Sequence, residues 1–581
     1  MPRGFPVYKA GSIFASHYSS MDLTLTAASI ALGLISHFFF NRYEPRSANS
    51  ALPVLALLPP LLLVAMQVSL ALRTVLFTYT IFLMTLTTSI AVYRISPFHP
   101  LAAYPGPTIC KITKLWSVGI AATGYQYRYL KTLHDTYGPY VRTGPNELSV
   151  VDAKMVGEIL GSGGLQKGRY YESGRHESTP PSIVSLSGEA HAAQRRVWSR
   201  ALTSAAIREY EPALVKRAKQ LVACIDAERR AHDGVVDVVK WVDLFALDLM
   251  GDLSFGGGFE GMKTGNVEHG QLIRSFMAYA NHDPTCLFNV PYDSAAHIPG
   301  HIPWILPTLH ILPGVGRMIQ DFNDFGHALA TQRVKNGSPG GAKDLWYHLA
   351  DEAGTEKERP SLARSASDGI VAIVAASDTA AAVMSSFMWR LLQEPEVYAL
   401  IREELDRVFA DVAMDDLDAL CEEDKQQELV YLCACINETL RLHPPVPTNG
   451  TRQVHLDEPA RLLAGRLIPP GTSIYTPAYA LHRQPTYFPF PDAFRPARWL
   501  PPTHDPAAFI PFSLGPANCV GQKFARHEML LVLSMLLHVF DFAVAGVGAE
   551  GELGRWIDSV HDHFVTSRGP LRVRVTLRGN V

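Results

Sequence analysis

The sequence predicts a mainly α-helical protein with small β-sheets, preceded by N-terminal transmembrane helices. Three features of the chain support this fold class. The first hundred residues carry three apolar runs almost free of charge, long helical patterns dominate the remainder, and strand patterns there are short. The best strand candidates are residues 141–151 and 571–577.

The apolar runs lie at residues 23–40, 51–72 and 75–93. Each is close to the roughly 20 residues that span a bilayer as a helix. We interpret residues 1–97 as a membrane anchor of three transmembrane helices. A cleavable signal peptide is the alternative for the first run, although that run begins late and two more follow. Pro59 and Pro60 interrupt the second run, so a re-entrant hairpin is the alternative there.

Basic residues beside the runs predict their orientation. Two follow the first run and three follow the third, which favours the cytosol for those flanks: Arg42, Arg46, Arg94, Lys111 and Lys114. Arg3 and Lys9 at the other end weaken the asymmetry. We therefore expect a multi-pass protein whose main body faces the cytosol.

A proline-rich stretch at residues 99–107 joins the anchor to the body. Its three X-Pro steps and one glycine predict an extended turn of restricted conformation, which would fix the direction of the chain between anchor and body. Residues 98–581 then form one body with no linker-like composition inside it. Two short loop patterns, at 338–341 and 354–359, flank a helix within that body.

Composition excludes several classes of protein. A hydrophobic fraction of 47%, 18% charged residues and a net charge of -3 suit a globular protein with a large core, not a nucleic-acid binder. The seven cysteines are scattered and odd in number, which argues against a disulfide framework and for a reducing compartment. Cys433 and Cys435 lack the second cysteine pair that a zinc site needs.

The stretch 512–521 places one cysteine, Cys519, in a Pro/Gly-rich loop directly before a long helical pattern. A helix N-terminus favours a thiolate and should lower the thiol pKa from about 8.5. Gly515 and Gly521 would let the backbone approach a flat, bulky group, and Phe512 would pack near the sulfur. A haem iron with an axial thiolate fits this pattern. A buried structural cysteine is the alternative, and the more common one for a lone cysteine.

A helix expected over residues 368–393 has small residues at its centre, followed by Asp378 and Thr379. The small face would admit a flat ligand. A mid-helix threonine can bond back to a carbonyl one turn earlier and open the helix to water, which would supply a proton path. A helix-packing face with an N-capping-type Asp-Thr pair is the alternative, and in isolation the favoured one.

Glu438 and Arg441 lie three residues apart on one helix face, just before Pro444 and Pro445 end that helix. An exposed pair of this kind would contribute only about 0.3–0.5 kcal/mol. Another arginine, Arg498, stands in a proline-punctuated segment ahead of the cysteine loop. A buried glutamate that holds both arginines would be a structural lock.

In this order, the motifs resemble those of the cytochrome P450 superfamily of haem-thiolate monooxygenases. The family signature Phe-x-x-Gly-x-Arg-x-Cys-x-Gly is matched at Phe512, Gly515, Cys519 and Gly521. The oxygen-activating helix is matched at Ala375, Asp378 and Thr379, and the family's lock at Glu438, Arg441 and Arg498. The resemblance covers the body from residue 99 onward. It implies the P450 fold, haem b, Cys519 as the axial iron ligand, and proton delivery by Asp378 and Thr379.

Two positions depart from the family pattern. Ala517 replaces the signature arginine, which usually meets a haem propionate, and Ala376 replaces a glycine common in the oxygen helix. Losing one charged hydrogen bond costs about 1.5–3 kcal/mol. His191 and Arg195 share a predicted helix face where the family commonly has Trp-x-x-x-Arg, so we expect them to contact the propionates. A solvated helix face is the alternative.

Neither a flavin nor a nicotinamide fingerprint follows the cysteine loop, so electrons must come from another protein. The hinge resembles that of microsomal members, which implies the endoplasmic reticulum membrane, NADPH–cytochrome P450 reductase as donor, and cytochrome b5 as a further donor. Four cations could form a basic docking face for an acidic flavodoxin-like domain, with an ordinary solvated surface as the alternative: Arg196, Arg200, Lys523 and Arg526.

The residues expected around the substrate are mostly apolar or small. By analogy with the family they are 179–186, 371–376, 446–448 and 564–566. Residues 299–315 resemble a membrane-dipping lip, with core packing as an equal alternative. We expect a monooxygenase that inserts one oxygen atom from O2 into a lipophilic small molecule, as in fungal secondary metabolism, for example of terpenoids. Xenobiotic oxidation, and reductase-independent isomerisation or dehydration, are the alternatives; the intact Asp378-Thr379 pair disfavours the latter.

Overall fold

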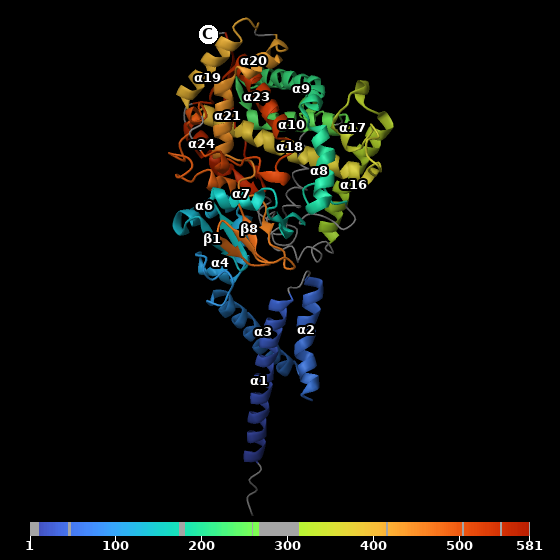
Figure 1. Cartoon of the computed structure of the whole chain (residues 1–581), viewed down its shortest axis with the longest axis vertical. Coiled ribbons are helices and arrows are strands. Elements are labelled where there is room, and N and C mark those ends of the chain that lie inside the picture. The colour runs from blue at the N-terminus through green and yellow to red at the C-terminus, as the bar shows by residue number, and fades with distance from the viewer. Residues whose placement is uncertain are drawn as a thin grey trace, which may run out of the picture.

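The computed structural model describes residues 11–43, 48–172, 180–257, 259–265, 313–413, 416–501, 505–546 and 549–579. Three helices extend away from a mainly helical body, to which they are joined at one end (Figure 1). These anchor helices are α1 (Gly11–Arg42), α2 (Ala48–Ala65) and α3 (Leu72–Ile95). Their apolar side chains are largely exposed, as helices in lipid require.

Two of the three anchor helices meet the length and hydropathy of a membrane span, over Leu23–Arg42 and Leu72–Ile95. The second apolar run is helical only as far as Ala65, and its apolar part, Ala51–Ala65, is shorter. The 30-residue helix Leu362–Leu391 is apolar enough as well, but 67% of its most apolar window is buried inside the body.

The helices α1 and α3 run in the same direction along the chain. Gly33 lies against Phe82 and Thr85, and four residues later the His37 ring contacts Tyr93 with centroids 5.6 Å apart. Because both contacts advance in the same direction along the two helices, α1 and α3 end at the same side of the anchor. The chain between them must therefore return, and α2 is the described helix in that connection.

The hinge after α3 is clamped to the body. The backbone N–H of Arg142 donates to the Pro105 carbonyl at 2.7 Å. Gly106 adopts a φ of 155°, and a Cβ there would lie 2.3 Å from the Arg142 carbonyl oxygen. Only glycine fits so close a backbone approach, so the proline-rich stretch fixes the position of the anchor relative to the first strand.

The body is built mainly of helices, and α18 runs through its centre (Figure 1). Its helices are α4 (Thr108–Ile112), α5 (Leu115–Ala122), α6 (Gln126–Tyr137), α7 (Ala153–Leu160), α8 (Gly188–Ala201), α9 (Ser204–Ala231), α10 (Val238–Phe255), α11 (Gly261–Thr264), α16 (Pro313–Asn336), α17 (Leu345–Leu349), α18 (Leu362–Leu391), α19 (Pro395–Val408), α20 (Glu423–Gln427), α21 (Val430–Leu442), α22 (Ala478–Leu481), α23 (Gln522–Val539) and α24 (Ala549–Arg555).

The strands form four small sheets. The largest has the order β1-β2-β8-β5-β3, from β1 (Tyr140–Gly144), β2 (Glu147–Val150), β8 (Ser473–Tyr475), β5 (Arg452–Gln453) and β3 (Gln166–Lys167). A three-stranded sheet joins β4 (Val235–Asp237), β12 (Arg572–Leu577) and β9 (Phe540–Val544). Two hairpins complete the set: β6 (Arg461–Leu463) with β7 (Arg466–Ile468), and β10 (His561–His563) with β11 (Val565–Ser567). Both strand candidates of the sequence are present, as β1–β2 and as β12.

Helix α18 begins six residues earlier than its sequence pattern suggested. The Ser361 side chain caps it by accepting from the backbone N–H of Arg364, and such a cap stabilises a helix start by about 1 kcal/mol. The main core joins α18 to α9, α10, α21 and α23. A second core lies between the large sheet, the hinge and the β6–β7 hairpin.

Candidate active site

The cysteine loop is closed by its own backbone. The N–H of Cys519 donates to the Phe512 carbonyl at 2.8 Å, and the N–H of Asn518 donates to the Gly515 carbonyl at 3.1 Å. Helix α23 starts at Gln522 with Gly521 as its N-cap, so Cys519 lies two residues before the cap. The Phe512 ring packs under the Arg526 guanidinium at 5.0 Å. The loop thus presents Cys519 at a helix start, as its sequence predicted.

The chain alone does not lower the pKa of Cys519. Burial raises the pKa of this thiol, and the backbone N–H of Gly521 and the charge of Arg195 offset only part of that effect. Cys519 is nevertheless a solvent-accessible residue. The expected thiolate therefore needs a stronger cation than the protein supplies, because desolvation outweighs the helix terminus.

The two glycines of the loop differ in what a side chain at their position would contact. Gly515 has a φ of 70°, and a Cβ there would lie 2.1 Å from the Leu160 carbonyl oxygen at the end of α7. Its close approach is therefore to the α7 backbone, not to a flat ligand. A Cβ at Gly521 would lie 3.9 Å from the Cys519 sulfur, an ordinary contact.

Arg195 reaches the cysteine loop from α8. Its Nη2 donates to the Asn518 side-chain oxygen at 2.6 Å and its Nη1 donates to the Asn518 carbonyl. Arg195 thus contacts the residue between Ala517 and Cys519, and brings a guanidinium to the part of the loop where the signature arginine is missing. His191, one turn earlier on α8, is buried.

Four basic side chains from three elements gather beside the loop. Burial, followed by the charges of Lys167, Arg195 and Arg452, lowers the pKa of His191 to about 4. Burial, followed by the charges of Arg452 and Arg195, lowers the pKa of Lys167 to about 7. The strand register places Lys167 directly opposite Arg452. Like charges facing each other across strands destabilise a sheet, so this cluster of basic side chains suits an anionic ligand.

One face of α18 is open although most of the helix is buried. The accessible positions recur at helical spacing, at residues 367, 371, 374–376 and 378–379. Ala375 is the most open of them. The Thr379 hydroxyl donates to the Ala375 carbonyl at 2.7 Å, one turn earlier. The structure therefore sets Asp378 and Thr379 on an accessible stripe of small residues.

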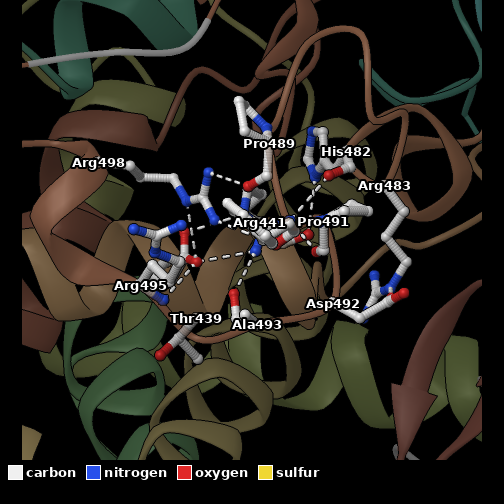
Figure 2. Close-up of polar contacts among 12 residues, drawn as sticks. Thr439, Arg441, His482, Arg483, Pro489, Pro491, Asp492, Ala493, Arg495 and Arg498 are labelled. Carbon is white, nitrogen blue, oxygen red and sulfur yellow. Dashed lines mark hydrogen bonds and ion pairs between the residues drawn. The ribbon is translucent and has the colours of Figure 1, made fainter.

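Glu438, Arg441 and Arg498 meet in a buried ion cluster (Figure 2). Arg441 binds the Glu438 carboxylate through two parallel hydrogen bonds of 2.9 and 2.8 Å, and Arg498 Nε donates to the same carboxylate at 3.1 Å. Arg441 Nη1 also donates to the carbonyls of His482 and Pro491, at 2.9 and 2.6 Å. Burial alone would raise the pKa of Glu438, but Arg441 first, then the Arg495 N–H and Arg498, hold it below its ordinary value.

His482 connects this ion cluster to the cysteine loop. It is fully buried; its Nδ1 lies 3.1 Å from the Arg441 carbonyl, and its Nε2 accepts the backbone N–H of Ile510 at 2.9 Å. The N–H of Ser513 donates in turn to the Ile510 carbonyl at 3.0 Å. Since Nε2 is an acceptor, the ring is the Nδ1–H tautomer. A hydrogen-bonded path thus runs from α21 to the loop that carries Cys519.

Aromatic side chains and one buried acid connect the segments expected around the substrate. The Thr448 hydroxyl donates to the buried Asp562 carboxylate, which also accepts the N–H of Phe564 at 3.1 Å. The Phe564 ring stacks on Tyr170 at 5.9 Å and meets Tyr171 edge-on at 6.2 Å. The segments 446–448 and 564–566 therefore share one wall with the tyrosines that follow β3.

Sequence reasoning missed Lys167, Arg452, Tyr170, Tyr171 and His482. Lys167 and Arg452 lie on two-residue strands, which are too short to show a period-two pattern. Near β3, the sequence feature that could have indicated these residues is the adjacent pair Tyr170 and Tyr171 shortly after Lys167. His482 is brought to the cysteine loop by tertiary folding, across 28 residues of chain.

The cationic side chains expected on a docking face differ in their exposure to solvent and in their partners. Arg196, Arg200 and Lys523 are exposed, while Arg526 is half-buried, donates to the Asn437 side chain at 2.6 Å and covers Phe512. Arg200 is paired with Glu356. Arg526 therefore holds the loop in place and is not a free surface charge.

Some expectations concern residues without a described structure. Residues 299–312 of the expected membrane lip and Thr179 of the expected substrate wall lie outside the described residues. Across the described ranges, no cluster of three or more His, Cys, Asp or Glu side chains is suited to hold a metal ion.

Comparison with known proteins identifies the class to which this fold and site belong. The cytochrome P450 family model matches residues 105–557, a range that holds the cysteine loop, the α18 stripe and the Glu438 cluster. The chain belongs to the cytochrome P450 family, and it is a cytochrome P450 monooxygenase. Membership implies a haem with a cysteine thiolate ligand. The donors fit such a group, because an accessible sulfur lies beside cations suited to two carboxylates.

Fungal proteins are among its relatives. Cytochrome P450 67 of Uromyces fabae is 29% identical over 89% of this chain and 93% of the relative. Tryprostatin B 6-hydroxylase of Aspergillus fumigatus is 28% identical over 86% of this chain and 84% of the relative. Averantin hydroxylase of Dothistroma septosporum is 30% identical over 79% of this chain and 83% of the relative. The apolar N-terminal helices before the matched range suggest membrane anchoring.

Proposed function

We propose that Cys519 is the axial iron ligand and that the enzyme inserts one oxygen atom from O2 into a lipophilic small molecule. The observation that carries this proposal is the position of the Cys519 sulfur. Cys519 is a solvent-accessible residue on a loop that Arg195 joins to a cluster of basic side chains. Bound haem supplies the oxygen activation and the oxidising power.

The chain's own residues hold the group and move protons. Lys167, His191, Arg195 and Arg452 would bind the haem carboxylates in place of the missing signature arginine. Thr379 would hold a water near its hydroxyl, which donates to the Ala375 carbonyl one turn earlier, and Asp378 beside it would pass protons in from solvent. The buried Glu438 cluster and His482 would hold the cysteine loop in register.

The test of the ligand is Cys519→Ser, with Cys433→Ser on α21 as the matched control. The serine variant at 519 should lose the reduced carbon monoxide band characteristic of thiolate ligation, whereas the control should keep it. A surviving band in the Cys519 variant would show that another residue ligates the iron.

Electrons would come from NADPH through a separate cytochrome P450 reductase, with cytochrome b5 as a further donor. The exposed Arg196 and Lys523 flank the cysteine side of the body and would face the acidic donor. Charge reversal of both should slow reduction by the reductase and remove its dependence on salt, because steering by exposed charges is screened. Lys335→Glu on α16 is the control. Unchanged reduction in the double variant would contradict this docking face.

The site would lie on the cytosolic side of the endoplasmic reticulum membrane, behind a three-span anchor. We propose a substrate from fungal secondary metabolism, such as a terpenoid. The support is the aromatic wall of Tyr170, Tyr171 and Phe564 and the small-molecule names of the hydroxylase relatives. Product analysis after co-expression with a reductase would identify the substrate. Turnover without O2 and NADPH would instead indicate an isomerase or dehydratase.

A further inference from the structure

Helix α8 is held by apolar packing only over its second half. Its buried apolar side chains are Val197, Trp198 and Ala201, all in the last two turns. In the first two turns the buried side chain is that of His191. Ser187 occupies the N-cap position, and within the described residues its side chain makes no capping hydrogen bond. Because apolar packing and capping normally fix a surface helix, the first half of α8 needs another restraint.

That restraint is the side-chain amide of Gln194, which lies between two charged side chains of α18. Gln194 Nε2 donates to the Asp368 carboxylate, and Arg364 Nη2 donates to the Gln194 side-chain oxygen at 2.7 Å. Arg364 Nε lies 3.4 Å from the same carboxylate, one turn away on α18. The three side chains thus form a closed ring of polar contacts, which we call the Gln194 bridge.

The acid of the Gln194 bridge is fully buried. Burial raises the pKa of Asp368 to about 6, while the Arg364 charge, the Trp198 indole and the Gln194 amide lower it. The carboxylate is therefore ionised at neutral pH, and its hydrogen bond from Gln194 is charge-assisted. Removing that donor would leave a buried charge with fewer partners, which makes the bridge a strong link between the two helices.

Gln194 is the sequence neighbour of Arg195, which holds the cysteine loop through Asn518 at 2.6 Å. Adjacent residues point about 100° apart around a helix axis, so Gln194 reaches α18 while Arg195 reaches the loop. A helix that is fixed at one of these side chains is fixed in rotation, and the direction of the other follows. The Arg195 charge also offsets part of the effect of burial on the pKa of Cys519.

We propose that Gln194 and Asp368 are positioning residues for the cysteine loop. The Gln194 bridge holds α8 in the rotation that keeps Arg195 on Asn518, and so keeps a guanidinium beside the axial thiolate. Helix α18, which carries Asp378 and Thr379, thereby also sets the charge on the cysteine side of the site. This inference rests on the proposed ligation of the iron by Cys519.

The first test measures how strongly the full-length holoenzyme keeps its thiolate ligand. In urea, the reduced carbon monoxide complex is divided between a thiolate form and a thiolate-free form. Gln194→Leu removes the amide at nearly constant size, and should shift this equilibrium about tenfold toward the thiolate-free form, the factor to which about 1.4 kcal/mol corresponds. Gln332→Leu, at an exposed glutamine on α16, is the matched control and should cause no shift. An unshifted equilibrium in Gln194→Leu would overturn the proposal.

A reversal of the bridge tests its partner. Gln194→Glu places a second carboxylate beside Asp368 and should also favour the thiolate-free form. Adding Asp368→Asn leaves one carboxylate and one amide, with Arg364 still beside them, and should restore most of the thiolate form. If the double variant is no better than Gln194→Glu alone, Gln194 does not act through Asp368 and the proposal is wrong.

Arg195→Ala separates positioning from general stabilisation of the fold. In that background Gln194→Leu should cause no further shift, because its effect passes through Arg195; additive shifts would contradict the proposal.

Hydrogen exchange of the holoenzyme, followed by mass spectrometry, gives a readout that needs no change at Arg195. Peptides from the first half of α8 should exchange faster in Gln194→Leu than in Gln332→Leu, and equal exchange would refute the bridge. This difference does not depend on which residue ligates the iron. A band that survives in Cys519→Ser would therefore contradict the proposed function while the exchange result stands.

Discussion

The family signature has an arginine where this chain has Ala517, and we expect basic residues distant in sequence to supply the missing positive charge. Lys167 on β3, His191 and Arg195 on α8, and Arg452 on β5 converge beside the cysteine loop. The facing pair Lys167 and Arg452 destabilises the chain unless an anion lies between their charges. Propionate binding would therefore be spread over several side chains instead of one signature residue.

This arrangement predicts a pH-dependent haem affinity that depends on Lys167. Its pKa is about 7 in the protein without an anionic partner, against 10.5 for an unperturbed lysine. A bound carboxylate raises that pKa, so binding takes up a proton above pH 7, and haem affinity should fall as pH rises through this range. Lys167→Met should weaken haem binding by about 1.5–3 kcal/mol. It should also abolish the dependence of haem affinity on pH.

Haem transfer to a scavenger protein on both sides of pH 7 measures this effect. Lys167→Arg is the control, since it keeps the charge while removing the titration. If haem affinity still falls with pH in the Met variant, the proton taken up on binding belongs to another group.

The loop glycines give a matched pair of substitutions. Gly515→Ala forces a Cβ against the Leu160 carbonyl at a positive φ, so it should destabilise the fold by at least 1–2 kcal/mol, roughly the cost of left-handed backbone alone. Gly521→Ala adds a methyl group at ordinary contact distance from the sulfur and should leave the stability of the haem-free chain nearly unchanged. Urea unfolding of both proteins without haem checks this. Equal loss in the two variants would contradict the α7 explanation.

At the scale of elements, the site depends on how α18, α21 and the cysteine loop are joined. The helix α21 holds its own Glu438 and Arg441, and the long segment before the loop folds around them. Removing one partner of such a buried charge cluster typically costs about 3–5 kcal/mol, whereas an exposed pair contributes little. His482 extends this cluster to Ile510 and so to the loop.

We expect His482→Phe to weaken thiolate ligation more than it lowers the free energy of unfolding of the chain. The ring is replaced by one of similar size that neither accepts the Ile510 N–H nor bonds the Arg441 carbonyl. The reduced carbon monoxide band should convert to the form without thiolate at lower denaturant concentration. His527→Phe on α23, which removes a half-buried contact with Glu211, is the control. Identical conversion of the two variants would indicate a packing role alone.

The α18 stripe offers a similar pair of hydroxyls. Thr379 and Ser377 both bond back one turn, at 2.7 Å, but Ser377 lies on the buried face. Thr379→Ala should keep haem and divert reducing equivalents to peroxide, because the water that Thr379 would hold is then lost. Ser377→Ala should not change the ratio of peroxide to product. Unchanged coupling in the Thr379 variant would refute its role in proton delivery.

At the scale of the whole molecule, the common direction of α1 and α3 supports three crossings of the membrane. Two helices that both cross in the same direction require α2 to recross between them. The apolar part of α2, Ala51–Ala65, is about 22 Å long, a few Å less than the roughly 27 Å of the endoplasmic reticulum bilayer. The prolines in its interior are tolerated where neighbouring helices restore the backbone contacts.

An N-glycosylation acceptor added at the N-terminus should therefore be modified in microsomes, whereas one added at the C-terminus should not. The N-terminus would be luminal and the body cytosolic. An unmodified N-terminal acceptor would mean that α2 does not cross.

Local patterns in the sequence were enough for several parts of the site. The apolar runs, the cysteine before α23, the Asp378-Thr379 step and the i,i+3 spacing of Glu438 and Arg441 lie within one or two turns of chain. Their geometry follows from helix periodicity alone. The anchor boundaries were less accurate, since α2 ends at Ala65 although the apolar run continues to Leu72.

The sequence by itself determined the class of this protein: a mainly helical cytochrome P450 with apolar N-terminal helices, in which Cys519, the acid–hydroxyl pair and the Glu438 pair are the motifs. Only the tertiary structure decided what surrounds them. Lys167 faces Arg452 through strand pairing, His482 reaches Ile510 from α22, and Gln194 joins α8 to α18. The physical reason is that short strands and long loops leave no periodic pattern, while burial and charge depend on neighbours far away in the chain.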